Sequence, residues 1–443
     1  MDAREAAMLA LNACQRQGGW SDGALKKQLS AAELSGRDAA LATQLCFGVL
    51  QNQMLLDFYL AKFSNIPLKR MEGKVVQTLR LGAYQMLFLT RIPHSAAVNS
   101  AVALVKAHCK NPRAAGMVNG ILRSMERSLQ NMPVIPQGDP VAYLSTLYSH
   151  PEWLVKEFIL SLGEEETAQL LAADNSQPPT AVMVNTTRTT AETLKAMLEA
   201  DHVEAEPHPW LENCLLLSRT GDLERLEAFQ QGLFYVQDPA SRLSVLAAGA
   251  KPGMRVLDCC AAPGGKSFAA AIAMENQGEI VSCDLHPHKK KLIQAGADRL
   301  GLTIITPKTA DGKVFRPEWE RAFDLVLVDA PCSGLGVIRK KPDIRYKDPA
   351  PLADLPAVQL DILRNAARYV RPGGTLMYST CTLLYRENGE VVETFLAENK
   401  AYKAETFTLP GPVGPVQSGS VTLWPHRHGT DGFFISKMRR EEA

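Results

Sequence analysis

The chain has 443 residues, of which 46% are hydrophobic and 21% are charged, and its net charge is +1. This length exceeds what one ordinary core holds, and the composition is typical of a soluble globular protein, so we expect two or three domains. No apolar run approaches the roughly 18 residues of a membrane span, and no basic region precedes an apolar signal core. These patterns exclude a membrane protein and predict a cytosolic one without a membrane partner.

The cysteines and histidines do not form a metal-binding pattern. None of the nine cysteines has the CxxC spacing, and only two pairs of the nine histidines, 286/288 and 426/428, are close in sequence. We therefore expect no metal. In a reducing compartment each cysteine is either a small buried residue or a thiol with a chemical role.

The near-neutral total conceals three segments of different charge. Residues 1–140 carry 16 Lys/Arg against nine Asp/Glu, residues 141–232 carry five against 15, and residues 233–443 carry 27 against 23. The pattern suggests three modules, of which the first and last are basic enough to face phosphates. The alternative is that each charge run is simply a solvated face.

Residues 1–135 are expected to form an all-helical domain. Apolar residues recur three and four positions apart in 39–63 and 74–89. After a break at IPHS, Ser95 is the expected N-cap of a further helix. The proline-containing stretch 131–140 predicts a linker.

Residues 141–232 are expected to form a small α+β subdomain, and residues 233–443 a larger α/β domain. In the last segment, short apolar runs end near a polar or small residue and alternate with helical stretches, which is typical of a doubly wound, mostly parallel sheet. Ligands bind such sheets at the carboxyl ends of the strands. Asp258, Asp284, Asp329 and Cys381 stand at these ends.

The stretch LDCCAAPGGKSF, residues 257–268, follows the first strand of that sheet. It ends like a Walker A loop, but Cys260 stands where that loop requires its first glycine. Asp284 ends the next strand, at the place of an acidic residue that bonds ribose hydroxyls. Because the G-x-G-x-x-G of dinucleotide enzymes is also missing, we favour a small nucleoside cofactor such as S-adenosylmethionine. For any one feature alone, a strand-turn-helix unit without ligand is the alternative.

Four motifs resemble those of the RNA cytosine-C5 methyltransferases. LDCCAAPGGK resembles the cofactor loop, residues 329–346 and 378–392 resemble the two cysteine motifs, and residues 426–440 resemble the closing strand pair. The resemblance implies a Rossmann-like, class I S-adenosylmethionine-dependent domain. It also implies a set of cofactor contacts, namely Cys260, Ala261, Ala262, Pro263, Gly264, Gly265, Lys266, Asp284, Asp311 and Asp329. For Asp311, an Asp-Gly turn is an equal alternative.

Methylation at C5 explains why two cysteines are needed. A thiolate that adds to C6 of cytosine makes C5 nucleophilic, and the thiol leaves after the C5 proton is lost. Spacing does not show whether Cys332 or Cys381 attacks. The resemblance implies that Cys381 attacks and Cys332 assists release. Asp329 is expected to bond the amine and N3 edge of the base, with a turn aspartate as the alternative.

The first domain resembles the RNA-binding helical factor NusB through LRLGAYQMLFL, IPHSAAVNSAVALVK and MVNGILR. A NusB-like domain fused to this catalytic domain is similar to one bacterial branch of the family. That resemblance implies 16S rRNA, naked or in an early small-subunit intermediate, as the substrate and cytosine 967 as the target. We expect the enzyme to act as a monomer.

The candidate RNA contacts are basic residues in two regions. They are Arg80, Lys106, Lys110, Arg113 and Arg123 in the helical domain, and Arg339, Lys340 and Lys341 after the first cysteine motif. Tyr346 is a candidate for base stacking, although buried aromatics are commoner. Three other functions stay open: methylation of another RNA, methylation of DNA, and a non-catalytic rRNA-binding role in assembly.

Overall fold

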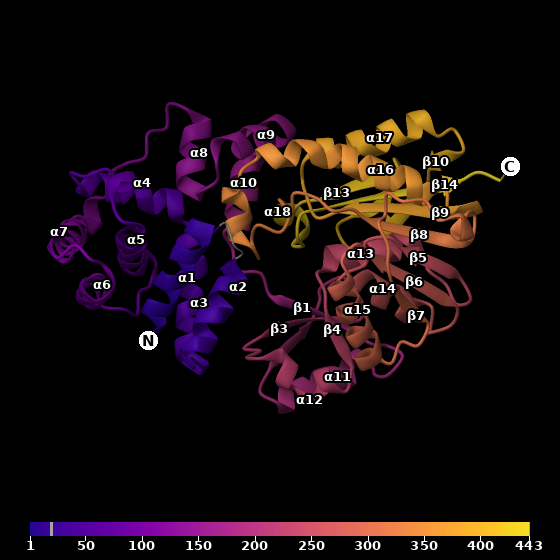
Figure 1. The fold of residues 1–443 in the computed structure, drawn as a ribbon, viewed down its shortest axis with the longest axis horizontal. Coiled ribbons are helices and arrows are strands. Elements are labelled where there is room, and N and C mark those ends of the chain that lie inside the picture. Colours follow the sequence, from indigo (N-terminus) through magenta and orange to yellow (C-terminus); the bar gives the residue numbers. More distant parts are fainter. Residues whose placement is uncertain (18–20, 443) are drawn as a thin grey trace. The chain divides into compact units, whose positions relative to one another are not determined.

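The computed structural model describes residues 1–17 and 21–442, and the chain forms two compact units (Figure 1). The first unit comprises Met1–Ser176 and Ile338–Lys347, and the second comprises Gln177–Val337 and Asp348–Ala443. Among the residues described, no helix is both long and apolar enough to cross a membrane.

The first unit is entirely helical. Helix α5 (Gly73–Phe88) is its centre, because nearly every side chain of this helix is buried and it packs against five neighbouring helices. The helices that surround it are α1 (Ala3–Gln17), α3 (Gly36–Gln51), α4 (Gln53–Phe63), α6 (His94–His108) and α7 (Arg113–Arg127), and α2 (Ser21–Ala31) packs on α1 and α3.

The helical periodicity of residues 39–63 is confirmed, with α3 and α4 meeting at Asn52. One local prediction for this unit needs correction. Helix α6 begins at His94 after Pro93, so Ser95 lies inside the first turn and is not the N-cap. Proline with its fixed φ is readily accommodated at a helix start, which is why the helix begins two residues earlier than expected.

The helical unit continues past the linker at 131–140. Asp139 caps α8 (Pro140–Tyr148) by accepting the backbone N–H groups of Val141 and Ala142. Helices α8, α9 (Glu152–Leu162) and α10 (Glu164–Asp174) pack on one another, and α8 packs on α4. These three helices therefore belong to the first compact unit, although their sequence lies in the acidic segment.

The second unit contains a small antiparallel sheet in the order β2-β3-β1-β4. Its strands are β1 (Thr180–Val184), β2 (Glu204–Pro207), β3 (Cys214–Ser218) and β4 (Phe234–Val236). Helix α11 (Ala191–Ala200) packs on this sheet through Leu194 and Leu198, and the short α12 (Glu227–Gln230) lies beside β4. The predicted α+β fold is confirmed for residues 180–236.

The main sheet of the second unit has the order β10-β14-β9-β8-β5-β6-β7, and β13 pairs with β14. Five strands are parallel: β5 (Arg255–Asp258), β6 (Glu279–Asp284), β7 (Ile305–Thr309), β8 (Phe323–Asp329) and β9 (Val370–Thr380). The antiparallel strands are β10 (Tyr402–Ala404), β13 (Ser420–Leu423) and β14 (Phe433–Arg440). The predicted Rossmann-like sheet is confirmed.

Helices cover both faces of this sheet (Figure 1). Leu325 and Leu327 of β8 pack in one layer with α13 (Pro239–Ala248), α14 (Gly265–Ala273) and α15 (Pro287–Leu300). Val326 and Val328 pack in the other layer with α16 (Leu355–Ala367) and α17 (Gly389–Glu398). The second unit also contains the hairpin β11 (Phe407–Leu409) and β12 (Gly414–Val416), and the short α18 (Pro425–His428).

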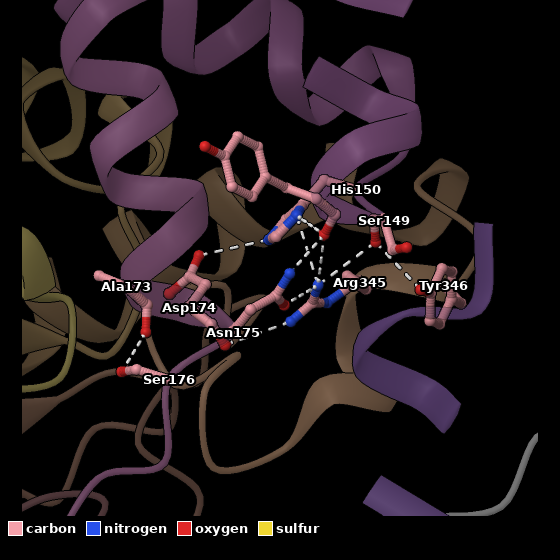
Figure 2. A network of polar contacts seen from close by, with 9 residues as sticks. Ser149, His150, Ala173, Asp174, Asn175, Ser176, Arg345 and Tyr346 are labelled. Carbon is pink, nitrogen blue, oxygen red and sulfur yellow. Dashed lines mark hydrogen bonds and ion pairs between the residues drawn. The ribbon is translucent and has the colours of Figure 1, made fainter. Parts of the chain in front are cut away.

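The chain returns to the helical unit with Ile338–Lys347, where Arg345 is fully buried (Figure 2). Its guanidinium donates to the side-chain oxygen of Asn175 at 2.8 Å and to the carbonyl oxygens of Tyr148 and Asp174 at 3.2 and 3.4 Å. The hydroxyl of Tyr346 donates to two backbone carbonyls, those of Leu50 and Ser149. These two hydrogen bonds favour the alternative interpretation of Tyr346, an aromatic residue with a structural role in this unit.

Candidate active site

The candidate active-site residues come together at the carboxyl edge of the parallel sheet. Asp258, Asp284 and Asp329 are the last residues of β5, β6 and β8, and Cys381 directly follows β9. Strands β8 and β9 are parallel neighbours with Asp329 opposite Ser379. This register places the two cysteine motifs side by side, as their position at strand ends predicts.

The sulfur atoms of Cys332 and Cys381 lie 3.3 Å apart, although 49 residues separate them in sequence. The pKa of the Cys332 thiol is well above its ordinary value, first because of its hydrogen bond with Cys381 and then because of burial. Cys332 therefore stays protonated near neutral pH and is able to donate a hydrogen bond to the sulfur of Cys381. Two thiols in contact are suited to a reaction in which one forms a bond and the other assists.

Asp329 joins the first cysteine motif to the cofactor loop. One carboxylate oxygen lies 2.6 Å from the Lys266 ammonium nitrogen, and the other accepts the hydroxyl of Ser379 at 2.9 Å. The Lys266 nitrogen also lies 5.0 Å from the ring centre of Phe433. Lys266 is thus paired with a carboxylate of its own chain, in keeping with the rejection of a Walker A role.

The loop from Cys260 to Lys266 makes a tight turn between β5 and α14. The N–H of Ala261 donates to the carbonyl of Cys283 on β6 at 2.7 Å, and the N–H of Gly264 donates to the carbonyl of Ala261 at 2.6 Å. Gly264 has φ +115°, which other residues rarely adopt, and a Cβ there would lie 2.3 Å from the ring of Phe268. Glycine therefore keeps the backbone open at this turn.

Asp258 stabilises the end of the loop through a hydrogen bond with Ser267. It is fully buried, and it accepts the hydroxyl of Ser267 at 2.7 Å, while Ser267 also lies 2.7 Å from the hydroxyl of Ser282. Burial raises the pKa of Asp258 to about 6. Its side chain points into the fold, which agrees with a supporting role.

The residues at the ends of β6 and β7 fit an adenosyl cofactor to different degrees. Asp284 accepts the N–H of His286 at 3.0 Å and lies 3.6 Å from the Lys289 nitrogen, which leaves lone pairs of its carboxylate for ribose hydroxyls. Asp311 accepts the N–H of Lys313 at 2.9 Å, as in the turn that was its alternative interpretation. The turn at Gly264, which has no side chain in the way of a ligand, together with the carboxylate of Asp284 at the end of β6, suits a nucleoside.

Three other cysteines, in or beside the cofactor loop, are not suited to act as thiolates. Burial raises the pKa of the Cys259, Cys260 and Cys283 thiols, so all three stay protonated. The part of the chain that the structure describes has no group of three or more His, Cys, Asp or Glu side chains arranged to hold a metal ion.

The predicted RNA contacts divide into exposed and buried residues. Arg80 is buried and forms two hydrogen bonds with Asp57, at 2.8 and 2.7 Å, so its predicted phosphate contact is corrected to a structural ion pair. The side chain of Arg339 is also buried, which corrects its predicted place on the surface. The exposed candidates are Lys106, Lys110, Arg113 and Lys341, with Lys340 half-buried and Arg123 paired with Glu126 at 2.8 Å.

Sequence reasoning missed four polar residues that support the cysteines. Ser379, Gln359, Glu387 and Asn388 are all buried. The sequence does show polar residues in YSTC (378–381) and the pair Glu387-Asn388 a few residues later. Their hydrogen-bond partners, however, are defined only when β8, β9 and α16 pack together.

Three family models match successive parts of the chain. They are described as "NusB family" (residues 1–127), "Methyltr_RsmF/B-like, ferredoxin-like domain" (residues 150–224) and "16S rRNA methyltransferase RsmB/F" (residues 245–439). The catalytic match contains both cysteine motifs and the cofactor loop.

Similar proteins extend over the whole chain. "Probable ribosomal RNA small subunit methyltransferase B" of Bacillus subtilis is 41% identical over 99% of this chain and 98% of its own length. "Ribosomal RNA small subunit methyltransferase B" of Salmonella paratyphi B is 30% identical over 92% and 91%. The crystal structure of PH0851 has a TM-score of 0.82 at 25% identity and covers 99% of this chain and 98% of that one. The structure of NSun6 from Pyrococcus horikoshii with SFG, at 22% identity and TM-score 0.58, covers 66% of this chain and 99% of that one, and it supports the fold.

The Rossmann-like sheet, its nucleoside loop and the two cysteine motifs define an S-adenosylmethionine-dependent RNA cytosine-C5 methyltransferase. Within that class the full-length similarity is specific. The chain belongs to the ribosomal RNA small subunit methyltransferase B family.

Proposed function

We propose that this enzyme methylates C5 of one cytosine in 16S rRNA, cytosine 967 by the family resemblance, through a covalent adduct between Cys381 and C6 of the base. The observation that carries the adduct is the 3.3 Å contact between the Cys332 and Cys381 sulfurs at the carboxyl edge of the sheet. The names of the full-length relatives and the 16S rRNA family model support the choice of RNA.

In this mechanism the two cysteines act in sequence. Cys381 attacks as the thiolate and forms a bond from its sulfur to C6, which moves electron density to C5. S-adenosylmethionine, when bound, supplies an electrophilic methyl group for C5. A base, for which solvent water is the proposed acceptor, then takes the C5 proton; the electron pair of the C5–H bond forms the C5=C6 double bond, and the sulfur–C6 bond breaks with its electron pair on the sulfur. The protonated Cys332 thiol donates to the departing sulfur of Cys381, and this stabilises the thiolate that leaves.

Asp329 is the proposed contact for the base. Its two oxygens already accept Ser379 and Lys266, and each keeps a lone pair for the exocyclic amine of cytosine. Uracil has no amine donor at this position, so a carboxylate here selects cytosine. The paired Lys266 holds the Asp329 carboxylate in place.

The proposed cofactor contacts are the loop Cys260–Lys266, Asp284 for the ribose, and Asp311 near the adenine. Support comes from the open turn at Gly264 and from the position of Asp284 at the end of the second strand. For the RNA backbone, the exposed residues Lys106, Lys110 and Arg113 are the proposed contacts in the helical unit. A division into domains 1–135, 141–232 and 233–443, and a monomeric state, stay predictions.

The substrate is tested by incubating the enzyme with methyl-labelled S-adenosylmethionine and naked 16S rRNA, assembled small subunits or duplex DNA. Label is expected in the rRNA, at one cytosine that sequencing identifies. Label in DNA alone would overturn the proposal.

The mechanism is tested by trapping the adduct. Cys381→Ala is expected to abolish turnover, and Cys332→Ala is expected to accumulate an RNA–protein adduct that survives denaturing electrophoresis. Cys283→Ala, which changes a buried cysteine on the same sheet, serves as the matched control and is expected to turn over without accumulating the adduct. An adduct formed by Cys381→Ala and not by Cys332→Ala would reverse the assigned roles.

A further inference from the structure

The loops that carry the two cysteines both contact one turn, Glu387–Asn388, which precedes α17. Glu387 is fully buried and Asn388 is 2% exposed. Glu387 ends a short 3-10 turn (Tyr385–Glu387), and its backbone carbonyl accepts the hydroxyl of the buried Tyr378 at 2.7 Å. A buried carboxylate in this place requires a reason, because an unpaired charge is costly to bury.

Glu387 holds the backbone on both sides of Cys332. Its Oε2 accepts the N–H of Ser333 at 2.9 Å and the side-chain amide of Gln359 at 2.9 Å. The same amide nitrogen of Gln359 donates to the carbonyl of Pro331 at 3.0 Å. The residues before and after Cys332 are therefore fixed to one carboxylate.

Asn388 does the same for Cys381. Its Oδ1 accepts the hydroxyl of Thr380 at 2.5 Å, and its Nδ2 donates to the carbonyl of Thr382 at 3.0 Å. The hydroxyls of Ser333 and Thr382 lie 2.7 Å apart and join the two loops directly. Neighbouring residues of one turn thus control the separation of the two thiols.

We propose that Glu387 and Asn388 are positioning residues of this reaction, with Asn388 placing Cys381 for attack and Glu387 placing Cys332 for release. This inference rests on the proposed function. A displacement of about 1 Å in a reacting group is enough to cost roughly 100-fold in rate, so hydrogen bonds that fix both loops have a direct kinetic consequence.

The charge of Glu387 adds a second effect on Cys332. After the hydrogen bond with Cys381 and burial, the negative charges of Cys381 and Glu387 also raise the pKa of the Cys332 thiol. Glu387→Gln removes the charge but keeps the size of the side chain, so it is expected to lower the pKa of Cys332 while the burial of the thiol stays nearly the same. The pH dependence of product release therefore distinguishes positioning through this carboxylate from general support of the fold.

The test compares Glu387→Gln and Asn388→Ala with two control variants on the same helix. Glu393→Gln makes the same chemical change at an exposed residue whose carboxylate accepts the hydroxyl of Tyr385, and Asn399→Ala removes a half-buried amide at the end of α17. The measurements are the single-turnover rate of adduct formation, the rate of release from the adduct, the pH profile of release, and the melting temperature.

Glu387→Gln is expected to slow release about tenfold, to accumulate adduct, and to move the pH profile of release toward lower pH. Asn388→Ala is expected to slow adduct formation about tenfold without accumulating adduct. Neither control is expected to change these steps.

If Cys332→Ala traps its adduct as expected, the proposed function stands, and either of two results would then overturn the inference. One is a Glu387→Gln enzyme with the release rate and pH profile of Glu393→Gln, and the other is an equal slowing of the same step by both turn variants. Loss of the folding transition in Glu387→Gln would also contradict a positioning role, because the carboxylate would then be needed for the fold. Failure of Cys332→Ala to trap an adduct would instead overturn the proposed function itself, and this inference with it.

Discussion

Two clusters of buried polar side chains, one in each unit, differ in what their members bind. Around Arg345 in the helical unit, the guanidinium is surrounded by carbonyl and amide oxygens of its own unit (Figure 2). Around Cys332 and Cys381 in the sheet unit, the supporting groups are fixed by hydrogen bonds, whereas the thiols contact each other and are half-buried. The first arrangement encloses its central group, whereas the second leaves two thiols partly exposed at the edge of the sheet.

Burial also affects the ionisable groups of the two clusters differently. In the helical unit it lowers the pKa of His150, whose ring lies 3.5 Å from the Asp174 carboxylate. In the sheet unit the hydrogen bond with Cys381, followed by burial, raises the pKa of the Cys332 thiol. We therefore expect substitutions in the two clusters to separate activity from stability.

The largest expected effect is on the activity of Cys381→Ala. Because the proposed nucleophile is lost, the single-turnover rate of methyl transfer is expected to fall by about 10⁴-fold or more. The free energy of unfolding, measured by urea denaturation, is expected to change by less than about 1 kcal/mol, since the substitution is small and half-buried. A stability loss as large as that of Arg345→Met would break the comparison.

Arg345→Met is expected to have the opposite profile. Removing the guanidinium leaves buried oxygen acceptors and the Asp174 carboxylate without their cation, and breaking a buried arrangement of this kind costs about 3–5 kcal/mol. The matched control is Arg123→Met on the same unit, whose ion pair with Glu126 is partly exposed and contributes about 1 kcal/mol or less. Equal effects of the two variants on urea unfolding would contradict the structural role of Arg345.

A third prediction concerns the pH dependence of stability through Asp258. Burial raises the pKa of Asp258 from 3.8 to about 6, so the folded state binds this proton more tightly than the unfolded chain. The resulting stabilisation is complete below pH 3.8 and is lost as the pH rises through about 6. A difference of about two units corresponds to roughly 3 kcal/mol.

The comparison of wild type with Asp258→Asn isolates this contribution, because asparagine does not titrate. Between pH 4 and pH 7, the unfolding free energy of the wild type is expected to fall relative to that of the variant. A constant difference between the two proteins across this range would show that Asp258 is ionised throughout.

The smallest expected effect is on RNA binding by the exposed basic residues of the helical unit. Each of Lys106→Ala, Lys110→Ala and Arg113→Ala is expected to weaken RNA binding modestly and to reduce the salt slope of log K by about one. Filter binding at several salt concentrations measures the slope, and Lys156→Ala, an exposed lysine of α9, is the control. An unchanged slope in all three variants would remove the helical surface from the RNA interface.

Much of this fold follows from local pattern. The parallel strands and the helices between them follow from the periodicity of apolar residues. The turn at 264–265 follows from glycine, which adopts backbone conformations that other residues rarely adopt. The two cysteines could also be placed together, because strand ends of a parallel sheet meet at one edge.

The rest depends on tertiary packing. Arg339-Lys340-Lys341 has the composition of a basic surface loop, yet Arg339 is buried because this segment packs in the helical unit. Arg80 lies on a helix that is buried almost all round, and its partner Asp57 comes from α4. Glu387 and Asn388 have no local pattern that names Ser333 or Thr382 as partners, since those contacts form only when the strands are in register.

The return of the chain at Ile338–Lys347 has a consequence for dividing this protein experimentally. A fragment that ends at Ser176 would lack Arg345 and leave its buried oxygen acceptors without their donor, while a fragment that begins at Gln177 would carry that arginine without its binding site. Neither compact unit is encoded by one continuous stretch of gene. We therefore expect the two fragments to form a complete helical unit only when they are supplied together.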